Sequence, residues 1–78
     1  MASSRITHMR IKGALALQGL SFSHVARELG VAPSTVVIVS QGGRRSRRIE
    51  AAIAQAIHSK PETLWPDRYR AETEQAGR

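Results

Sequence analysis

Several residue types that limit a protein's chemistry are absent or scarce in this chain of 78 residues. It has no cysteine, which excludes disulfide bonds and thiolate metal sites. Its six acidic residues are scattered, and no two of them form an obvious catalytic pair. Its three histidines lack the spacing of metal ligands. We therefore expect one small domain that is not an enzyme and holds no metal or cofactor.

Long apolar runs are missing as well. The longest candidate, residues 13–20, is interrupted by a glutamine and is far shorter than the roughly 18 residues that a membrane helix needs. The same stretch is too short for a secretory signal. The lack of cysteine fits a reducing compartment. These features predict a cytoplasmic protein that does not bind membranes.

Positive charge is what the chain has in excess. It carries 12 lysines and arginines against six acids, a net charge of +6. The excess lies in residues 1–60, which hold nine cations and two acids, and four arginines crowd into residues 44–48. A small protein with this balance is expected to bind a polyanion. Only three aromatic residues are present, which argues against single-stranded RNA, since its recognition relies on aromatic stacking.

The periodicity of apolar residues predicts an all-α fold of four to five helices. We expect a flexible arm at residues 1–6, a compact domain at 7–69 and a flexible tail at 70–78. Ser21 and Ser46 are candidate N-caps, and Ser59 competes with Lys60 as the cap of the last short helix. Trp65 is expected to be buried against the preceding helix.

The segment after Pro33 contains a conflict between local and tertiary preferences. Four β-branched residues follow one another at positions 36–39, a run that favours a strand. Pro33 and the short preceding turn favour a helix over about residues 33–40. We favour the helix, with Val36 and Val39 in the core and Val37 and Ile38 facing outward.

Ala26, Gly30 and Val36 have the spacing of a helix-turn-helix. In that motif a small residue lets the second helix cross, glycine makes the turn, and the second helix enters the major groove. This predicts groove or base contacts from residues of the second helix: Pro33, Ser34, Thr35, Val37, Ile38 and Gln41. Phosphate contacts are expected from hydroxyl groups and arginines on either side: Ser21, Ser23, Arg27, Arg44, Arg45, Arg47 and Arg48.

Two segments resemble a known family. GLSFSHVARELGVAPSTV resembles the helix-turn-helix of lambda-repressor-like domains, and KPETLWPDRY resembles the C-terminal signature of the phage Mu Ner family. Together the resemblance spans roughly residues 8–70. It implies a Ner-like transcriptional regulator, with repression as the expected outcome.

The sequence thus predicts a regulator that binds specific sequences in double-stranded DNA. Two alternatives stay open at this point. One is a small protein-interaction module that uses Val37 and Ile38 as its contact patch. The other is an architectural binder of DNA or RNA with little sequence preference. No small-molecule ligand is indicated, and self-association as a dimer on DNA is left undecided.

Overall fold

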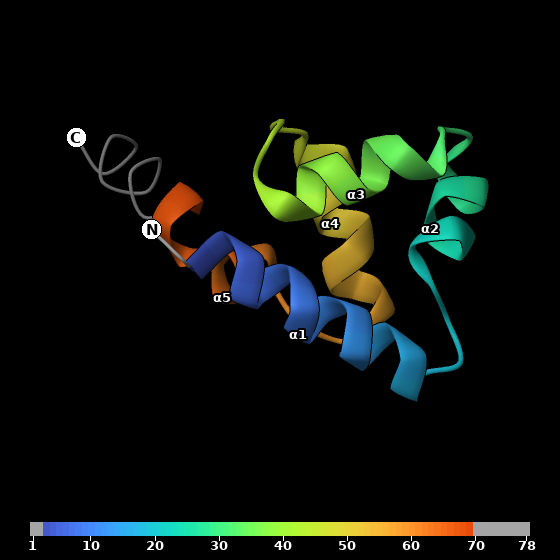
Figure 1. Ribbon diagram of the computed structural model, residues 1–78, viewed down its shortest axis with the longest axis horizontal. Helices are drawn as coiled ribbons and strands as arrows, with labels where there is room; N and C mark the ends of the chain where they lie inside the picture. Colours follow the sequence, from blue (N-terminus) through green and yellow to red (C-terminus); the bar gives the residue numbers. More distant parts are fainter. Residues whose placement is uncertain (1–2, 70–78) are drawn as a thin grey trace.

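The computed structural model describes residues 3–69, which form five α-helices joined by short turns (Figure 1). The prediction of an all-α domain with four to five helices is confirmed. A further helical turn covers residues 66–69, and the expected tail at 70–78 lies outside the described residues. The helices are α1 (Ser3–Leu17), α2 (Phe22–Leu29), α3 (Pro33–Gln41), α4 (Arg47–Ala56) and α5 (Pro61–Leu64).

Helix α1 begins earlier than the sequence predicted. It starts at Ser3, so residues 3–6 of the expected flexible arm are helical. Ile6 and Arg10, on its first turns, line one side of a hollow whose other side is residues 63–68. Ile6, itself 50% exposed, is the one large apolar residue in residues 3–6, too few to predict helix from periodicity.

The helix ends follow local rules that the sequence showed. The hydroxyl oxygens of Ser21 and Ser46 accept hydrogen bonds from His24 N and Ile49 N, so both predicted N-caps are confirmed. Lys60, and not Ser59, precedes the first residue of α5. Gly30 ends α2 at φ +73°, where the Val31 N–H reaches the Ala26 carbonyl at 3.0 Å. This pair of features is a Schellman turn, which needs a left-handed residue.

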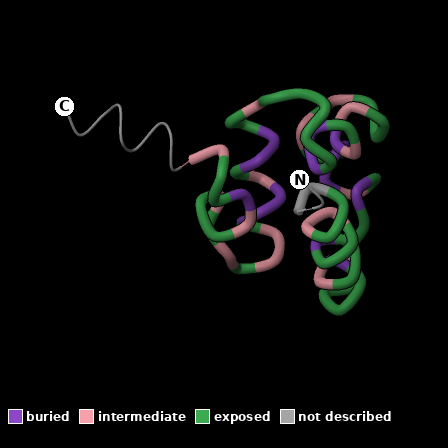
Figure 2. The backbone as a smooth tube through the Cα atoms, turned by 60° about the vertical axis from the view of Figure 1, so that its left-hand side comes forward, coloured by how far each residue is buried: buried purple, intermediate pink, exposed green. Residues whose placement is uncertain are grey.

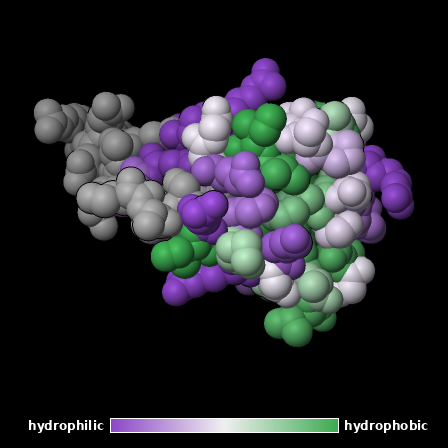
Figure 3. Space-filling view, in the orientation of Figure 1, coloured by the Kyte–Doolittle hydropathy of each residue, from purple (hydrophilic) through white to green (hydrophobic). Residues whose placement is uncertain are grey.

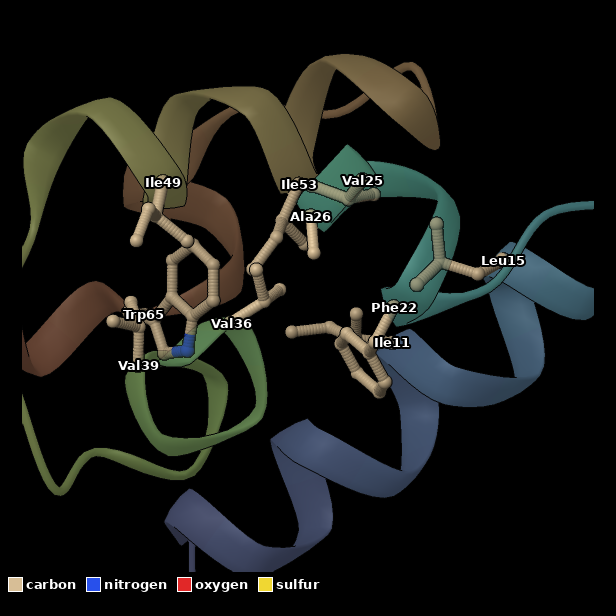
Figure 4. Packing of buried hydrophobic residues seen from close by; sticks show 10 residues of the cluster. All are labelled: Ile11, Leu15, Phe22, Val25, Ala26, Val36, Val39, Ile49, Ile53 and Trp65. Carbon is tan, nitrogen blue, oxygen red and sulfur yellow. The ribbon is translucent and has the colours of Figure 1, made fainter. Parts of the chain in front are cut away.

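The valine-rich segment is helical, as favoured above. Val36 and Val39 are both fully buried, and they lie between α1, α2 and α4 (Figure 4). Burial of this face in the core outweighs the local preference of β-branched residues for strands. Exposed and buried stretches alternate along the helices around this centre (Figure 2). The core consists of Ile11, Leu15, Phe22, Val25, Ala26, Val36, Val39, Ile49, Ile53 and Trp65.

Helix α4 runs through the middle of this packing and contacts α2, α3 and α5. Ile49 and Ile53, four residues apart and thus on one face of α4, are buried. Trp65 is 4% exposed, and its ring lies beside Ile49 and Val39 (Figure 4), so its predicted place in the core is confirmed. Within the described residues, no helix is long and apolar enough to cross a membrane.

Two glycines provide a matched test of the turn. Gly30 and Gly13 both have open space where a Cβ would be, but only Gly30 has a positive φ. We expect Gly30→Ala to lower the free energy of unfolding by about 1–2 kcal/mol, because the left-handed region is unfavourable for alanine. Gly13→Ala, inside α1, is expected to raise it by about 0.5–1 kcal/mol. Urea unfolding of both variants checks the pair, and equal signs would contradict the assignment of the turn.

Candidate nucleic-acid interface

Helices α2 and α3 form the helix-turn-helix. The turn is three residues long, from Gly30 to Ala32. Ala26 is 1% exposed and Val36 is 0% exposed, so the small residue and the valine fill the angle between the two helices as predicted. Helix α3 lies along one edge of the molecule, with α1 across the opposite side of the view (Figure 1). The outer side of α3 is therefore accessible.

Ser34, Ile38 and Gln41 share this outer side of α3. Their spacing of four and three residues places them on one helical face, and all three are exposed. Pro33 is exposed at the start of the same helix. Figure 3 shows a hydrophobic area over α3 that is bordered by hydrophilic side chains. The face thus combines a hydroxyl, an amide and an apolar side chain.

The remaining two predicted groove residues, Thr35 and Val37, are less accessible to DNA than the three on the outer face. Val37 is half-buried and packs against the core, and Thr35 is half-buried as well. The expectation that Val37 faces outward is therefore only half right, because its side chain divides between the core and the rim of the exposed face. Ser34, Ile38 and Gln41 are the centre of that face.

Donor groups are found at the start of α3 and on the exposed side of α2. The N-cap residue of α3, Ala32, has no side-chain oxygen, Pro33 has no N–H, and the Thr35 N–H donates to the Ala32 carbonyl at 3.0 Å. The Ser34 N–H is therefore the donor without a partner in the helix. An uncapped helix N-terminus attracts anions. On α2, Ser23 and Arg27 are exposed and lie one turn apart, and Ser21 is exposed while its oxygen caps the helix. These groups give α2, the first helix of the helix-turn-helix, an exposed set of hydroxyl and cationic side chains.

The arginine loop is less uniform than its sequence suggests. Arg44 is exposed. The Arg45 Nε donates to Glu50 Oε2 at 3.1 Å, and the Arg48 Nη2 donates to the Leu29 carbonyl at 2.9 Å. The prediction treated all four arginines as equivalent phosphate ligands, whereas Arg45, Arg47 and Arg48 also interact with groups within the protein. The hydrogen bond of Arg48 ties the start of α4 to the end of α2.

Glu50 is a central residue that sequence reasoning missed. Its side chain is fully buried, although the helical pattern assigned the buried face of α4 to apolar residues. Glu50 Oε2 accepts from Arg45, from the Ser46 N–H at 3.3 Å and from Arg68 at 3.1 Å, and Oε1 accepts from the Tyr69 hydroxyl. The available signal was that Glu50 is the one acid between residues 29 and 61, directly after the arginine loop.

Ser40 and His8 form a second polar contact that the sequence did not reveal. Ser40, on α3, is fully buried. The Nδ1 atom of His8, on α1, lies 2.8 Å from the Ser40 hydroxyl oxygen, and its ring stacks on Phe22 with centroids 5.0 Å apart. Burial, and secondly the nearby charge of Lys12, lower the pKa of His8 from its usual 6.5. The neutral imidazole thus helps to fix α3 against α1.

No part of the chain that the structure describes brings together three or more histidine, cysteine, aspartate or glutamate residues that would hold a metal ion. What the described surface offers is an exposed helix face bordered by cationic and hydroxyl groups. This is chemistry suited to a nucleic acid.

Comparison with known proteins identifies the family. Residues 6–78 match the family described as winged helix-turn-helix DNA-binding. The chain belongs to this family. It is also 40% identical over 52 residues to a negative regulator of transcription from Escherichia phage Mu, and the match covers 67% of each protein. No solved structure matches the chain. The predicted helix-turn-helix and the resemblance to the phage Mu regulators are both confirmed.

His8 makes the stability of the domain dependent on pH. Because its pKa is lower in the folded chain than the ordinary 6.5, the unfolded chain binds this proton more readily, and the free energy of unfolding falls as the pH drops below that value. We expect His8→Gln to remove part of this loss. Urea unfolding of the wild type and of His8→Gln, each at about pH 7.5 and at about pH 5, measures how far the free energy of unfolding falls in each protein. An equal loss in the two proteins would show that His8 contributes nothing to it.

Proposed function

We propose that this protein binds specific sequences in double-stranded DNA by inserting α3 into the major groove, and that it represses transcription there. The observation that carries the proposal is the exposed face of Ser34, Ile38 and Gln41, held by a helix-turn-helix in a chain of a DNA-binding family. The major groove is wide enough to admit such a helix.

The side chains on this face favour A·T base pairs. The amide of Gln41 has the donor and acceptor geometry that matches adenine N6 and N7. Ile38, 42% exposed, makes no hydrogen bond and suits the methyl group of thymine. The Ser34 hydroxyl donates or accepts with either kind of pair. No arginine lies on α3 to read guanine.

Phosphate contacts come from the groups around this face. Arg44 and Arg47 lie in and after the loop that follows α3, and Arg27 and Ser23 lie on α2. At the start of α3, where Pro33 has no N–H and the Thr35 N–H is bonded to the Ala32 carbonyl, the Ser34 N–H adds one backbone donor. Such contacts fix the register of the protein on DNA and make its affinity depend on salt. Ser21, Arg45 and Arg48 complete the set, the last two with their structural partners retained.

Repression is supported by the relative from phage Mu, whose name states that it is a negative regulator of transcription. A small domain with no catalytic constellation on its described surface acts most simply by occupying its DNA site. We further propose that two copies bind half-sites about one helical turn apart, because one short helix reads few base pairs. This activity places the protein with the nucleoid in the cytoplasm.

The first experiment is selection of bound duplexes from a random library at about 0.15 M salt, where sequence-independent phosphate binding is weakened. We expect a motif rich in A·T pairs, repeated with a spacing of one helical turn if two copies bind. Binding without any enriched motif would contradict the proposal. It would favour an architectural role or a protein partner docked on the exposed Ile38.

Two substitutions separate base reading from phosphate binding. Gln41→Ala is expected to cost about 1–3 kcal/mol on the selected duplex and almost nothing on a shuffled one, because it removes one base contact. Arg44→Ala is expected to weaken both duplexes alike and to reduce the salt slope by about one unit. Fluorescence anisotropy titrations at several salt concentrations measure both. An unchanged preference in Gln41→Ala would move base reading elsewhere on α3.

A further inference from the structure

The C-terminal end of α3 is held by a segment far along the chain. The Val39 carbonyl accepts from Arg68 Nη2 at 3.0 Å, and the Ser40 carbonyl accepts from Trp65 Nε1 at 3.3 Å. The last carbonyls of a helix have no partner within the helix. Here the Ser40 carbonyl is bound by a side chain 25 residues away, and the Val39 carbonyl, which also accepts from the Gly42 N–H at 3.2 Å, is bound by one 29 residues away. The end of the recognition helix is therefore tied to residues 65–69.

Arg68 joins this tie to the buried carboxylate. Its Nη1 donates to Glu50 Oε2 at 3.1 Å while its Nη2 binds Val39. Its guanidinium also lies 4.8 Å from the centre of the Trp65 ring. The planar fork of arginine permits all three contacts at once. One side chain thus links α3, α4 and the C-terminal segment.

The same carboxylate holds the loop that follows α3. Glu50 Oε2 receives Arg45 Nε and the Ser46 N–H, at 3.1 and 3.3 Å. The Arg45 guanidinium lies 5.6 Å from the centre of the Tyr69 ring, and the Tyr69 hydroxyl donates to Glu50 Oε1. The exit of α3 and the loop beyond it are therefore fixed to one point, the Glu50 side chain.

We propose that Arg68, acting through Glu50, is a positioning residue that determines the sequence selectivity of α3 without touching DNA. This inference rests on the proposed function. By binding the end of α3 and the loop together, the Glu50–Arg68 pair fixes the angle at which Ser34, Ile38 and Gln41 meet the base edges. Hydrogen bonds to bases weaken steeply with small errors in distance and angle, so this angle decides discrimination between sequences.

The alternative role for Arg68 is direct contact with phosphate. Its side chain is only 12% exposed, against 44% for Arg45. It already has two hydrogen-bond partners and an aromatic ring against its face. A phosphate ligand would strengthen binding to every sequence equally. The two roles therefore differ in which duplexes they affect.

The test compares Arg68→Lys with the wild type on two probes: the duplex that the wild type enriches, and a shuffled duplex of the same composition. Lysine keeps the charge but has no planar fork to bind Glu50 and Val39 together. We expect the ratio of the two affinities to fall about tenfold, in the range of one lost base contact. The affinity for the shuffled duplex and the salt slope should stay at wild-type values. Arg5→Lys, an exposed site on α1, is the matched control and should keep the wild-type ratio.

A second variant keeps the test decisive if Arg68→Lys does not fold. Tyr69→Phe removes only the hydroxyl that donates to Glu50 and is expected to lower the ratio in the same direction by a smaller factor. Circular dichroism confirms that each variant is folded at the temperature of the titration. A folded variant with lower thermal stability and an unchanged ratio would overturn the inference, and so would an equal loss on both duplexes. A wild type that enriches no motif would instead overturn the proposed function, and the inference with it.

Discussion

The buried carboxylate of Glu50 is the interaction on which the placement of the end of α3 and of the loop after it depends. Removing a charge from water is unfavourable unless the protein supplies partners. Here two guanidinium groups, a backbone N–H and a phenol supply them, from the loop before α4 and from the segment after α5. Because these partners come from separate parts of the chain, the carboxylate is satisfied only when those parts are correctly placed. Its burial therefore makes the position of the loop and of the end of α3 a condition of folding.

This arrangement also explains how so small a domain presents a helix with a free outer face. Val36, Val39 and Ser40 are the residues of α3 that are buried in the core. The residues on the opposite side of the helix are therefore not needed for packing. Its start follows the left-handed turn at Gly30, and its end is bound by Trp65 and Arg68. Both ends are thus fixed by contacts outside the exposed face. Residues on that face can vary with the DNA sequence to be read while the fold is kept.

The parts of this fold that the sequence predicted are those set by neighbours along the chain. Ser21, Ser46 and Gly30 act within one turn of their own positions, and a helix-turn-helix is defined by short spacings. Burial of Glu50 and Ser40 depends instead on side chains 18 to 32 residues away, which no local pattern contains. The early start of α1 was not predictable either, because residues 3–6 carry a single large apolar residue and so no periodic pattern. For the candidate site, the face of α3 was predictable from helical geometry, but the different partners of the arginines were not.

These partners change how the charge of the protein should be understood. Ten of its twelve cations are arginine. A net charge calculated from composition counts all of them as equally able to attract DNA. In the folded chain Arg44 is exposed, Arg48 donates to the end of α2, and Arg68 shares the buried carboxylate of Glu50 with Arg45. Only cations that replace counterions on phosphates contribute to the salt dependence of binding. The salt slope therefore reports only the arginines that reach phosphates, whereas Arg68, which is 12% exposed and bound to Glu50 and to the Val39 carbonyl, serves to hold the end of α3.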